Sequence, residues 1–196
     1  MVAALLAHLR VCAATELIEP AGSFRRRRET VGDLDVLVAS ADPGAVMAQV
    51  HSFPQVRQKL GAGDTRTSVV LTCGIQLDVR VVPRESFGAA LIYFTGSKAH
   101  CVHLRRIAQL KDLLLNEYGL FRGDAQVAGR EEEDVYRALG LDWIAPELRE
   151  DRGELDAAAK HRLPRLIARG DLRGDLHTHS TWTDGRASIE TMARAA

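Results

Sequence analysis

Two short apolar segments that carry aspartates most constrain what this chain can fold into. They read LDVLVA at 34–39 and IQLDVRVV at 75–82, and their β-branched content predicts two strands. On a strand, residues i and i+2 share a face, so Asp33 and Asp35 point the same way. Asp78 lies among apolar neighbours on the second strand. If the two strands are neighbours in a sheet, three carboxylates converge.

Converging carboxylates predict a particular chemistry. Ionised carboxylates at short range repel one another and favour a cation between them. Hard oxygen ligands at this density suit Mg²⁺, which completes its shell with water and substrate phosphates. Two such ions about 4 Å apart can activate an attacking oxygen and stabilise a leaving one in phosphoryl transfer. The alternative is a strand end with solvated acids, which a DxD pair alone does not exclude.

A Gly-Ser pair and a run of arginines precede the carboxylates by about ten residues. Gly22 and Ser23 form a turn that offers backbone N–H groups and a hydroxyl to a phosphate. Arg26 can supply a fixed positive charge to the same anion. An anion-binding turn beside a metal cluster is the outline of a nucleoside triphosphate site.

The remaining spacing predicts a mixed α+β unit, then a helical unit, and a new segment from about residue 171. Helices are expected at 2–17, 43–51, 86–94, 98–115, 131–139 and 146–162. Further strands are expected at 55–60, 66–72 and 173–176. Asp42 and Ser97 are expected to cap helix N-termini, and Gly140 to end a helix in the left-handed conformation.

Composition excludes several classes of protein. Among 196 residues, 26 Lys and Arg balance 26 Asp and Glu, so net charge does not by itself point to nucleic acid. The three cysteines are far apart and include no CxxC pair, which argues against a disulfide framework and for a cytoplasmic setting. No apolar run approaches the ~18 residues of a membrane span, and the N-terminus lacks signal-peptide features.

The combination of motifs resembles the family X DNA polymerases, within the wider nucleotidyltransferase fold. GSFRR followed by ETVGDLDVL resembles the palm motif, and LDVRVVP resembles the strand with the third catalytic aspartate. ESFGAALIYFTGSKAH at 85–100 is similar to the palm-to-thumb passage, and LNEYGLF at 115–121 to the thumb. Residues 171–185 resemble the first motif of a PHP (polymerase and histidinol phosphatase) domain. The resemblance implies an α+β palm at 1–92, a small helical thumb at 93–170 and a truncated PHP start at 171–196.

The resemblance also implies roles for individual residues. Two Mg²⁺ (or Mn²⁺) ions would be held by Asp33, Asp35 and Asp78, and Asp78 would also be the base or ligand partner for the primer 3′-hydroxyl. The triphosphate would contact Gly22, Ser23, Arg26 and Gly32. The sugar and base of the nucleotide would lie along Tyr93, Phe94 and Gly96, and Arg105 would face the DNA template. The expected partners are a DNA primer-template and a deoxynucleoside triphosphate (dNTP), with the chain acting as a monomer away from membranes.

The chain departs from the family pattern at two positions and at both ends. Val31 stands where relatives often have a small hydroxyl residue, and Cys101 where an asparagine often contacts the base. The helical DNA-gripping domain of such polymerases does not fit ahead of Gly22. In a complete PHP domain, His177, His179 and Asp184 would ligate Zn²⁺ or Mn²⁺. In this chain we expect an incomplete site without nuclease activity. In the family, the other metal ligands of the PHP site come from later strands.

Three functions are therefore open at the level of sequence. The leading one is a DNA polymerase core that extends a primer by two-metal-ion catalysis, in gap-filling DNA repair. The second is a nucleotidyltransferase that acts on a protein, antibiotic or RNA acceptor, against which the YFTGS passage and the thumb argue. The third is an inactive DNA-binding fragment, against which the retained acidic triad argues.

Overall fold

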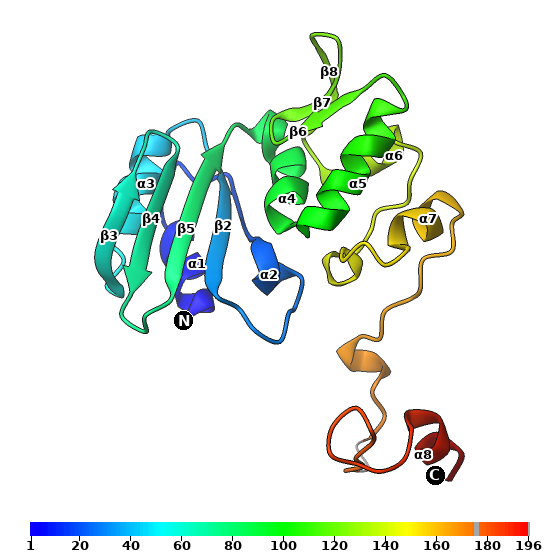
Figure 1. The fold of residues 1–196 in the computed structure, drawn as a ribbon. Helices are drawn as coiled ribbons and strands as arrows, with labels where there is room; N and C mark the ends of the chain where they lie inside the picture. Colours follow the sequence, from blue (N-terminus) through cyan, green and yellow to red (C-terminus); the bar gives the residue numbers. More distant parts are fainter. Residues whose placement is uncertain (175–176, 196) are drawn as a thin grey trace. The chain divides into compact units, whose positions relative to one another are not determined.

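The structure, a computed structural model, describes residues 1–174 and 177–195. The chain divides into two compact units, Met1–Leu163 and Pro164–Ala196. The first unit combines a five-stranded sheet with helices and a smaller three-stranded sheet, which confirms the predicted α+β class (Figure 1). Within the described part of the chain, no helix has both the length and the apolar character needed to cross a membrane.

The larger sheet has the strand order β1-β2-β5-β4-β3. Its strands are β1 (Leu17–Pro20), β2 (Asp33–Ala39), β3 (Val56–Ala62), β4 (Arg66–Leu71) and β5 (Gln76–Val82). The central strands β2 and β5 are parallel, and every other neighbouring pair is antiparallel. A parallel pair needs a long crossover connection, and here the chain between β2 and β5 supplies a helix and two strands.

Two helices cover the apolar face of this sheet: α1 (Val2–Arg10) and α3 (Pro43–His51). Their buried side chains form one core with the inward residues of β2 and β5, such as Leu34 and Val79. The Asp42 side chain accepts a hydrogen bond from the Ala45 backbone N–H at 3.0 Å, which confirms the predicted N-cap of α3. The face of the sheet opposite these two helices carries Asp33 and Asp35.

The second half of the first unit begins at α4 (Phe87–Thr95) and α5 (Lys98–Gln109). A small antiparallel sheet follows, made of β6 (Leu114–Asn116), β7 (Gly119–Arg122) and β8 (Ala125–Ala128). The helices α6 (Glu132–Ala138) and α7 (Glu154–Ala159) complete it. Ser97 caps α5 by accepting the His100 backbone N–H, and Gly140 has a φ of 73°, as the sequence predicted.

Three expected helices were wrong in extent. The helix expected at 2–17 ends at Arg10, because β1 pairs with β2 and buries Ile18. The helix expected at 98–115 ends at Gln109, and β6 begins at Leu114 in the small sheet that the sequence did not predict. The range 146–162 holds only a 3₁₀ turn at Pro146–Leu148 and α7. In the first two cases, strand pairing outweighed a local helical pattern.

The second unit contains a 3₁₀ turn at Arg169–Asp171 and α8 (Ile189–Ala195). A strand was expected at 173–176. Residues 173 and 174 are not in a strand, and 175–176 lie outside the described residues. The strand prediction is therefore wrong for its first half.

Candidate active site

The strand register brings the three predicted carboxylates to one face of the sheet. In the parallel pair β2/β5, Asp35 lies opposite Asp78 and Asp33 lies opposite Gln76. Asp33 and Asp35 alternate with Leu34, which is buried on the other face. Since a register slip of one residue would turn Asp78 to the core, this pairing decides whether a carboxylate cluster exists at all.

The carboxylates act on one another electrostatically. The pKa of Asp35 is raised from its ordinary value of 3.8 to about 6. Burial is the largest cause, followed by the negative charges of Asp33 and Asp78, whereas Arg80 and Arg26 act in the opposite direction. The nearby cations are therefore too few or too distant to neutralise the cluster.

Asp78 has two hydrogen-bond donors in the structure. The Ser68 hydroxyl donates to Oδ1 of Asp78, and the Gln76 amide donates to Oδ2 at 2.7 Å. In the ranges that the structure describes, no group of three His, Cys, Asp or Glu side chains is arranged to hold a metal ion. The three carboxylates suit a hard divalent cation by their chemistry. The hydrogen bonds from Ser68 and Gln76 use two of the about four lone-pair sites of the Asp78 carboxylate, which leaves sites for an ion.

Ser68 and Gln76 were not among the residues predicted for the site. Ser68 lies directly opposite Asp78 in the antiparallel pair β4/β5, and Gln76 precedes Asp78 by two residues on one strand face. The signal for Gln76 was present in the i, i+2 rule that grouped Asp33 with Asp35. Ser68 required the strand order, which the sequence did not supply.

The Gly-Ser turn adjoins the carboxylates through a close backbone approach. Gly22 begins the four-residue helix α2 (Gly22–Arg25) with a φ of 61°. A Cβ on Gly22 would lie 2.2 Å from Oδ2 of Asp35, so only glycine fits here. Ser23 follows and is half-buried, whereas Gly32 is exposed and a Cβ on it would meet nothing within 4 Å. The turn and Asp35 are therefore neighbours, and the structure gives no steric reason for the glycine at 32.

Arg26, the predicted phosphate ligand, is held by protein atoms in this structure. Its Nε donates to Oε1 of Glu150 at 2.9 Å, and its Nη1 donates to the carbonyl of Thr95. A Cβ on Gly96 would lie 3.1 Å from Nη1 of Arg26, which places Arg26 beside the predicted nucleotide residue Gly96. Arg26 thus connects the turn at Gly22 with the C-terminus of α4.

The aromatic residues at the end of α4 also lie near predicted site residues. Tyr93 is 41% exposed and meets Phe94 edge-on, with ring centroids 5.0 Å apart. Phe94 lies under the guanidinium of Arg80, 4.4 Å from it. Tyr93 and Arg105 line one small cavity, and Arg105 donates a long 3.4 Å hydrogen bond to the Cys101 carbonyl. The structure therefore groups Tyr93, Cys101 and Arg105 around one small cavity.

The three residues predicted for a PHP metal site all lie in the second unit. His179 Nδ1 is 2.6 Å from Oδ1 of Asp184, and this pair lowers the pKa of Asp184. The rings of His177 and His179 meet edge-on, with centroids 5.4 Å apart. The three side chains are thus near one another in sequence and partly in space, without forming a described three-ligand group.

The first unit also contains a buried ion cluster, centred on Glu132. Glu132 is 5% exposed and accepts hydrogen bonds from both Arg25 and the fully buried Arg149, at 2.7 to 3.0 Å. Burial by itself raises the pKa of Glu132, but the hydrogen bonds and charges of the two arginines outweigh it and lower the pKa to about 2. Glu132 begins α6, within the helix expected at 131–139, but the sequence did not indicate that its side chain would be buried between two arginines.

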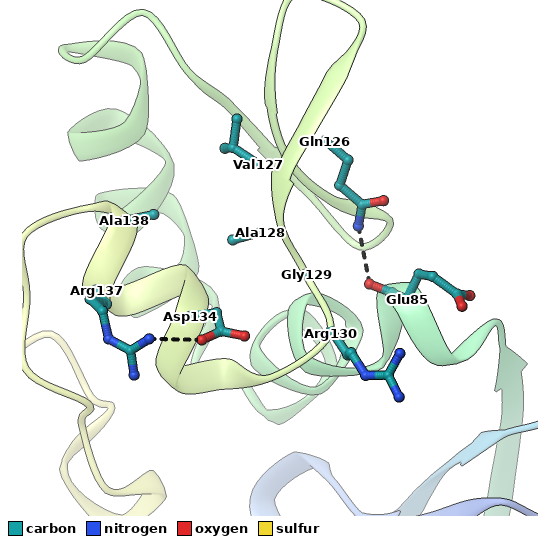
Figure 2. Close-up of a pocket in the computed structure, with 9 residues that line it drawn as sticks. All are labelled: Glu85, Gln126, Val127, Ala128, Gly129, Arg130, Asp134, Arg137 and Ala138. Atoms are coloured by element: carbon teal, nitrogen blue, oxygen red, sulfur yellow. Dashed lines mark hydrogen bonds and ion pairs between the residues drawn. The ribbon is translucent and has the colours of Figure 1, made fainter.

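A separate open cavity of about 450 Å³ lies between β8 and α6 (Figure 2). The Gln126 amide donates to the Glu85 carbonyl at its edge, and Arg137 pairs with Asp134 on the other side. None of the residues predicted for nucleotide, metal or DNA lines it. The carboxylate face therefore remains the candidate active site.

Comparison with known proteins finds matches over most of this chain. The family described as DNA polymerase beta thumb matches residues 90–150. DNA polymerase/3'-5' exonuclease PolX of Bacillus subtilis (strain 168) is 39% identical over 180 residues, which cover 89% of this chain and 31% of that protein. DNA polymerase lambda of Rattus norvegicus is 30% identical over 155 residues, covering 64% of this chain and 27% of that protein. DNA-directed DNA/RNA polymerase mu of Homo sapiens is 38% identical over 78 residues, 38% of this chain and 16% of that protein.

The fold and these matches define a class, that of proteins with a polymerase beta-like thumb next to an α+β sheet. Within that class, the chain belongs to the family X DNA polymerases, as its motifs predicted. It spans about a third or less of the length of the curated relatives it matches.

Proposed function

We propose that this chain is a DNA polymerase core that transfers a deoxynucleotidyl group from a dNTP to a primer 3′-hydroxyl. The observation that carries the proposal is the register of β2 and β5, which sets Asp35 opposite Asp78 beside the Gly22–Ser23 turn. Family membership supports DNA as the acceptor rather than a protein, antibiotic or RNA. Gap filling in DNA repair, in the cytoplasm and as a monomer, is part of the same proposal.

The carboxylates have the first role in this reaction. Asp33, Asp35 and Asp78 would hold two Mg²⁺ or Mn²⁺ ions, which supply Lewis-acid activation of the phosphoryl group when bound. The raised pKa of Asp35 supports this role, because a cation among the three carboxylates would relieve their mutual repulsion. Asp78 would also face the primer 3′-hydroxyl.

The remaining site residues would bind and orient the substrates. The N–H groups of Gly22 and Gly32, the Ser23 hydroxyl and the Arg26 guanidinium would contact the triphosphate. Tyr93, Phe94 and Gly96 would lie along the sugar and base, and Arg105 would face the template. Holding the two reactants in line can lower a barrier by several kcal/mol, so these contacts matter for rate as well as affinity.

The domain assignment belongs to the same proposal. We assign residues 1–92 to a palm, 93–170 to a thumb and 171–196 to the start of a PHP domain. His177, His179 and Asp184 would ligate Zn²⁺ or Mn²⁺ together with ligands of a complete PHP domain. For the residues of this chain alone we expect weak metal binding.

Primer extension tests the proposal. The chain is incubated with a gapped DNA duplex, the four dNTPs and either Mg²⁺ or Mn²⁺, and products are resolved by length. We expect extension that requires the divalent ion and the template base. Nucleotide transfer to RNA or protein in place of DNA, or retention of DNA without any extension, would contradict the proposal.

A further inference from the structure

Arg26 and Arg27, the two residues that follow α2, form ion pairs with the 3₁₀ turn at Pro146–Leu148 and with the residues just after it. Arg26 pairs with Glu150, and Arg27 pairs with Glu147, both at 2.9 Å. The two pairs differ in burial. The side chains of Arg26 and Glu150 are 14% and 20% exposed, whereas those of Arg27 and Glu147 are 79% and 33% exposed. Only the Arg26–Glu150 pair is shielded enough from water to hold a side chain in one position.

The backbone that carries Glu150 is itself firmly held. Its neighbour Arg149 is fully buried, and the Arg149 side chain binds Glu132 and the Ile144 carbonyl. The Arg149 carbonyl accepts the backbone N–H of Ser97 at 2.9 Å. A side chain presented from such a backbone can fix the geometry of its partner. Glu150 is therefore supported on the same segment that supports the start of α5.

The Arg26 guanidinium uses only some of its N–H groups to bind protein atoms. Nε donates to Glu150 and Nη1 donates to the Thr95 carbonyl. An arginine has five N–H donors, so these bonds leave donors on Nη1 and Nη2 for another acceptor. Those two nitrogens form the edge that binds a phosphate with two parallel hydrogen bonds. The guanidinium is thus oriented by protein oxygens while part of its donor capacity remains available.

We propose that Glu150 is a positioning residue for the triphosphate, acting through Arg26. This inference rests on the proposed function, because it takes Arg26 as a triphosphate ligand. By accepting the Nε–H of Arg26, Glu150 limits the rotamers of a long side chain before the nucleotide arrives. Ordering one such side chain at the moment of binding costs about 0.5 to 1.5 kcal/mol, which corresponds to a roughly 2- to 12-fold change in affinity.

The negative charge of Glu150 has the opposite effect on an anion. Arg28 lies 3.8 Å from the same carboxylate, so the three side chains Arg26, Arg28 and Glu150 sum to one positive charge. A carboxylate beside the triphosphate repels it, whereas the amide of glutamine accepts the same hydrogen bond without the charge. The two contributions can therefore be separated by comparing Glu150→Ala with Glu150→Gln.

Isothermal titration calorimetry of dTTP binding in the presence of Mg²⁺ tests the inference. The variants compared are Glu150→Ala, Glu150→Gln, Glu147→Ala and Arg26→Ala. We expect Glu150→Ala to raise the Kd for dTTP roughly 3- to 10-fold. Glu150→Gln should have a Kd at or below that of the unsubstituted chain. Glu147→Ala, which breaks the matched exposed pair, should change the Kd less than twofold. In primer extension, Glu150→Ala should raise KM by the same factor with little change in kcat.

Three outcomes would overturn the inference: an unchanged or lowered Kd for Glu150→Ala, an equal rise for Glu147→Ala, or a Glu150→Gln variant as weak as the alanine variant. Thermal unfolding of each variant guards against a loss of folding, and Glu150→Gln remains informative if the alanine variant unfolds. Arg26→Ala separates this inference from the proposed function. If Arg26→Ala does not weaken dTTP binding, the assignment of Arg26 to the triphosphate fails. If it does and Glu150→Ala does not, only the role of Glu150 fails.

Discussion

Asp35 and Glu132 are both carboxylates withdrawn from water, yet their surroundings move their pKa values in opposite directions. Burial and the charges of Asp33 and Asp78 raise the pKa of Asp35 to about 6. Glu132 is also opposed by burial, but Arg149 and Arg25 each give it two hydrogen bonds and lower its pKa to about 2. Trp143 adds a further hydrogen bond to Glu132 at 3.0 Å.

We interpret this difference as the one between a structural carboxylate, Glu132, and the carboxylate proposed for catalysis, Asp35. Glu132 already accepts five hydrogen bonds from protein side chains, so the fold depends on its partners and the carboxylate has no capacity left for a ligand. Asp35 sits among like charges, and the described residues supply its carboxylate with no side-chain hydrogen bond or ion pair. A site that leaves a carboxylate unneutralised costs stability, and such costs are typical of functional sites.

The largest effect is expected from removing the charge of Asp35. Asp35→Asn should lower the rate of primer extension roughly 1000-fold, because the metal-binding charge is lost where charge develops in the transition state. The same variant should not be less stable than the unsubstituted chain in metal-free buffer, since one of three repelling charges is gone. Extension assays and urea unfolding measure the two properties. Asp64→Asn, in an exposed loop, is the matched control, and a destabilised Asp35→Asn variant would contradict the comparison.

The next largest effect is expected on stability, from removing a partner of Glu132. Arg149→Met should lower the free energy of unfolding by about 3 to 5 kcal/mol, because it leaves Glu132 buried with one partner fewer. Urea unfolding followed by circular dichroism measures this change. The exposed pair of Arg137 with Asp134 provides the control: Asp134→Asn should change stability by less than about 0.5 kcal/mol. Equal effects of the two substitutions would remove the distinction drawn here.

The two carboxylates should also contribute to stability with opposite dependence on pH. Glu132 has a lowered pKa, so its contribution is complete above its ordinary pKa of 4.5 and is lost as the pH falls toward 2; it amounts to about 3 kcal/mol. Asp35 has a raised pKa, so its ionisation destabilises the fold as the pH rises from 3.8 through 6. Unfolding free energies measured from pH 3 to 7 should lose the first dependence in Glu132→Gln and the second in Asp35→Asn. Unaltered pH profiles in these variants would refute the assignment.

The smallest effect is expected from the exposed arginines beside the site. The Arg27 side chain is 79% exposed and that of Arg28 is 49% exposed, so neither is fixed as Arg26 is. If they contact the DNA backbone, each alanine substitution should reduce the slope of log K against log salt by about 1. Fluorescence anisotropy with labelled gapped DNA at several salt concentrations measures the slope. A slope that both substitutions leave unchanged would show that these arginines do not meet phosphates.

Local rules predicted the elements in which neighbouring residues act on one another. The alternation of aspartate and apolar residues at 33–39 places Asp33 and Asp35 on one face whatever the strand pairs with. Asp42 and Ser97 cap their helices with backbone N–H groups three residues away, so their roles were readable from the sequence. The same rules failed where a helical pattern met a stronger long-range partner, as at 10–20 and at 110–116.

Tertiary structure alone decided the partners of the charged residues around the carboxylates and Glu132. Asp78 faces Asp35 because β2 and β5 pair in parallel in one register, and Ser68 reaches Asp78 because β4 lies beside β5. Arg25 meets Glu132 and Arg26 meets Glu150 across 107 and 124 residues of chain. No periodicity links residues that far apart, because such contacts depend on how helices and sheets pack and not on the spacing within any one of them. The sequence by itself therefore determined which residues could form a phosphate and metal site. Packing determined that, among the described residues, two arginines bind the Glu132 side chain and none forms an ion pair with Asp35.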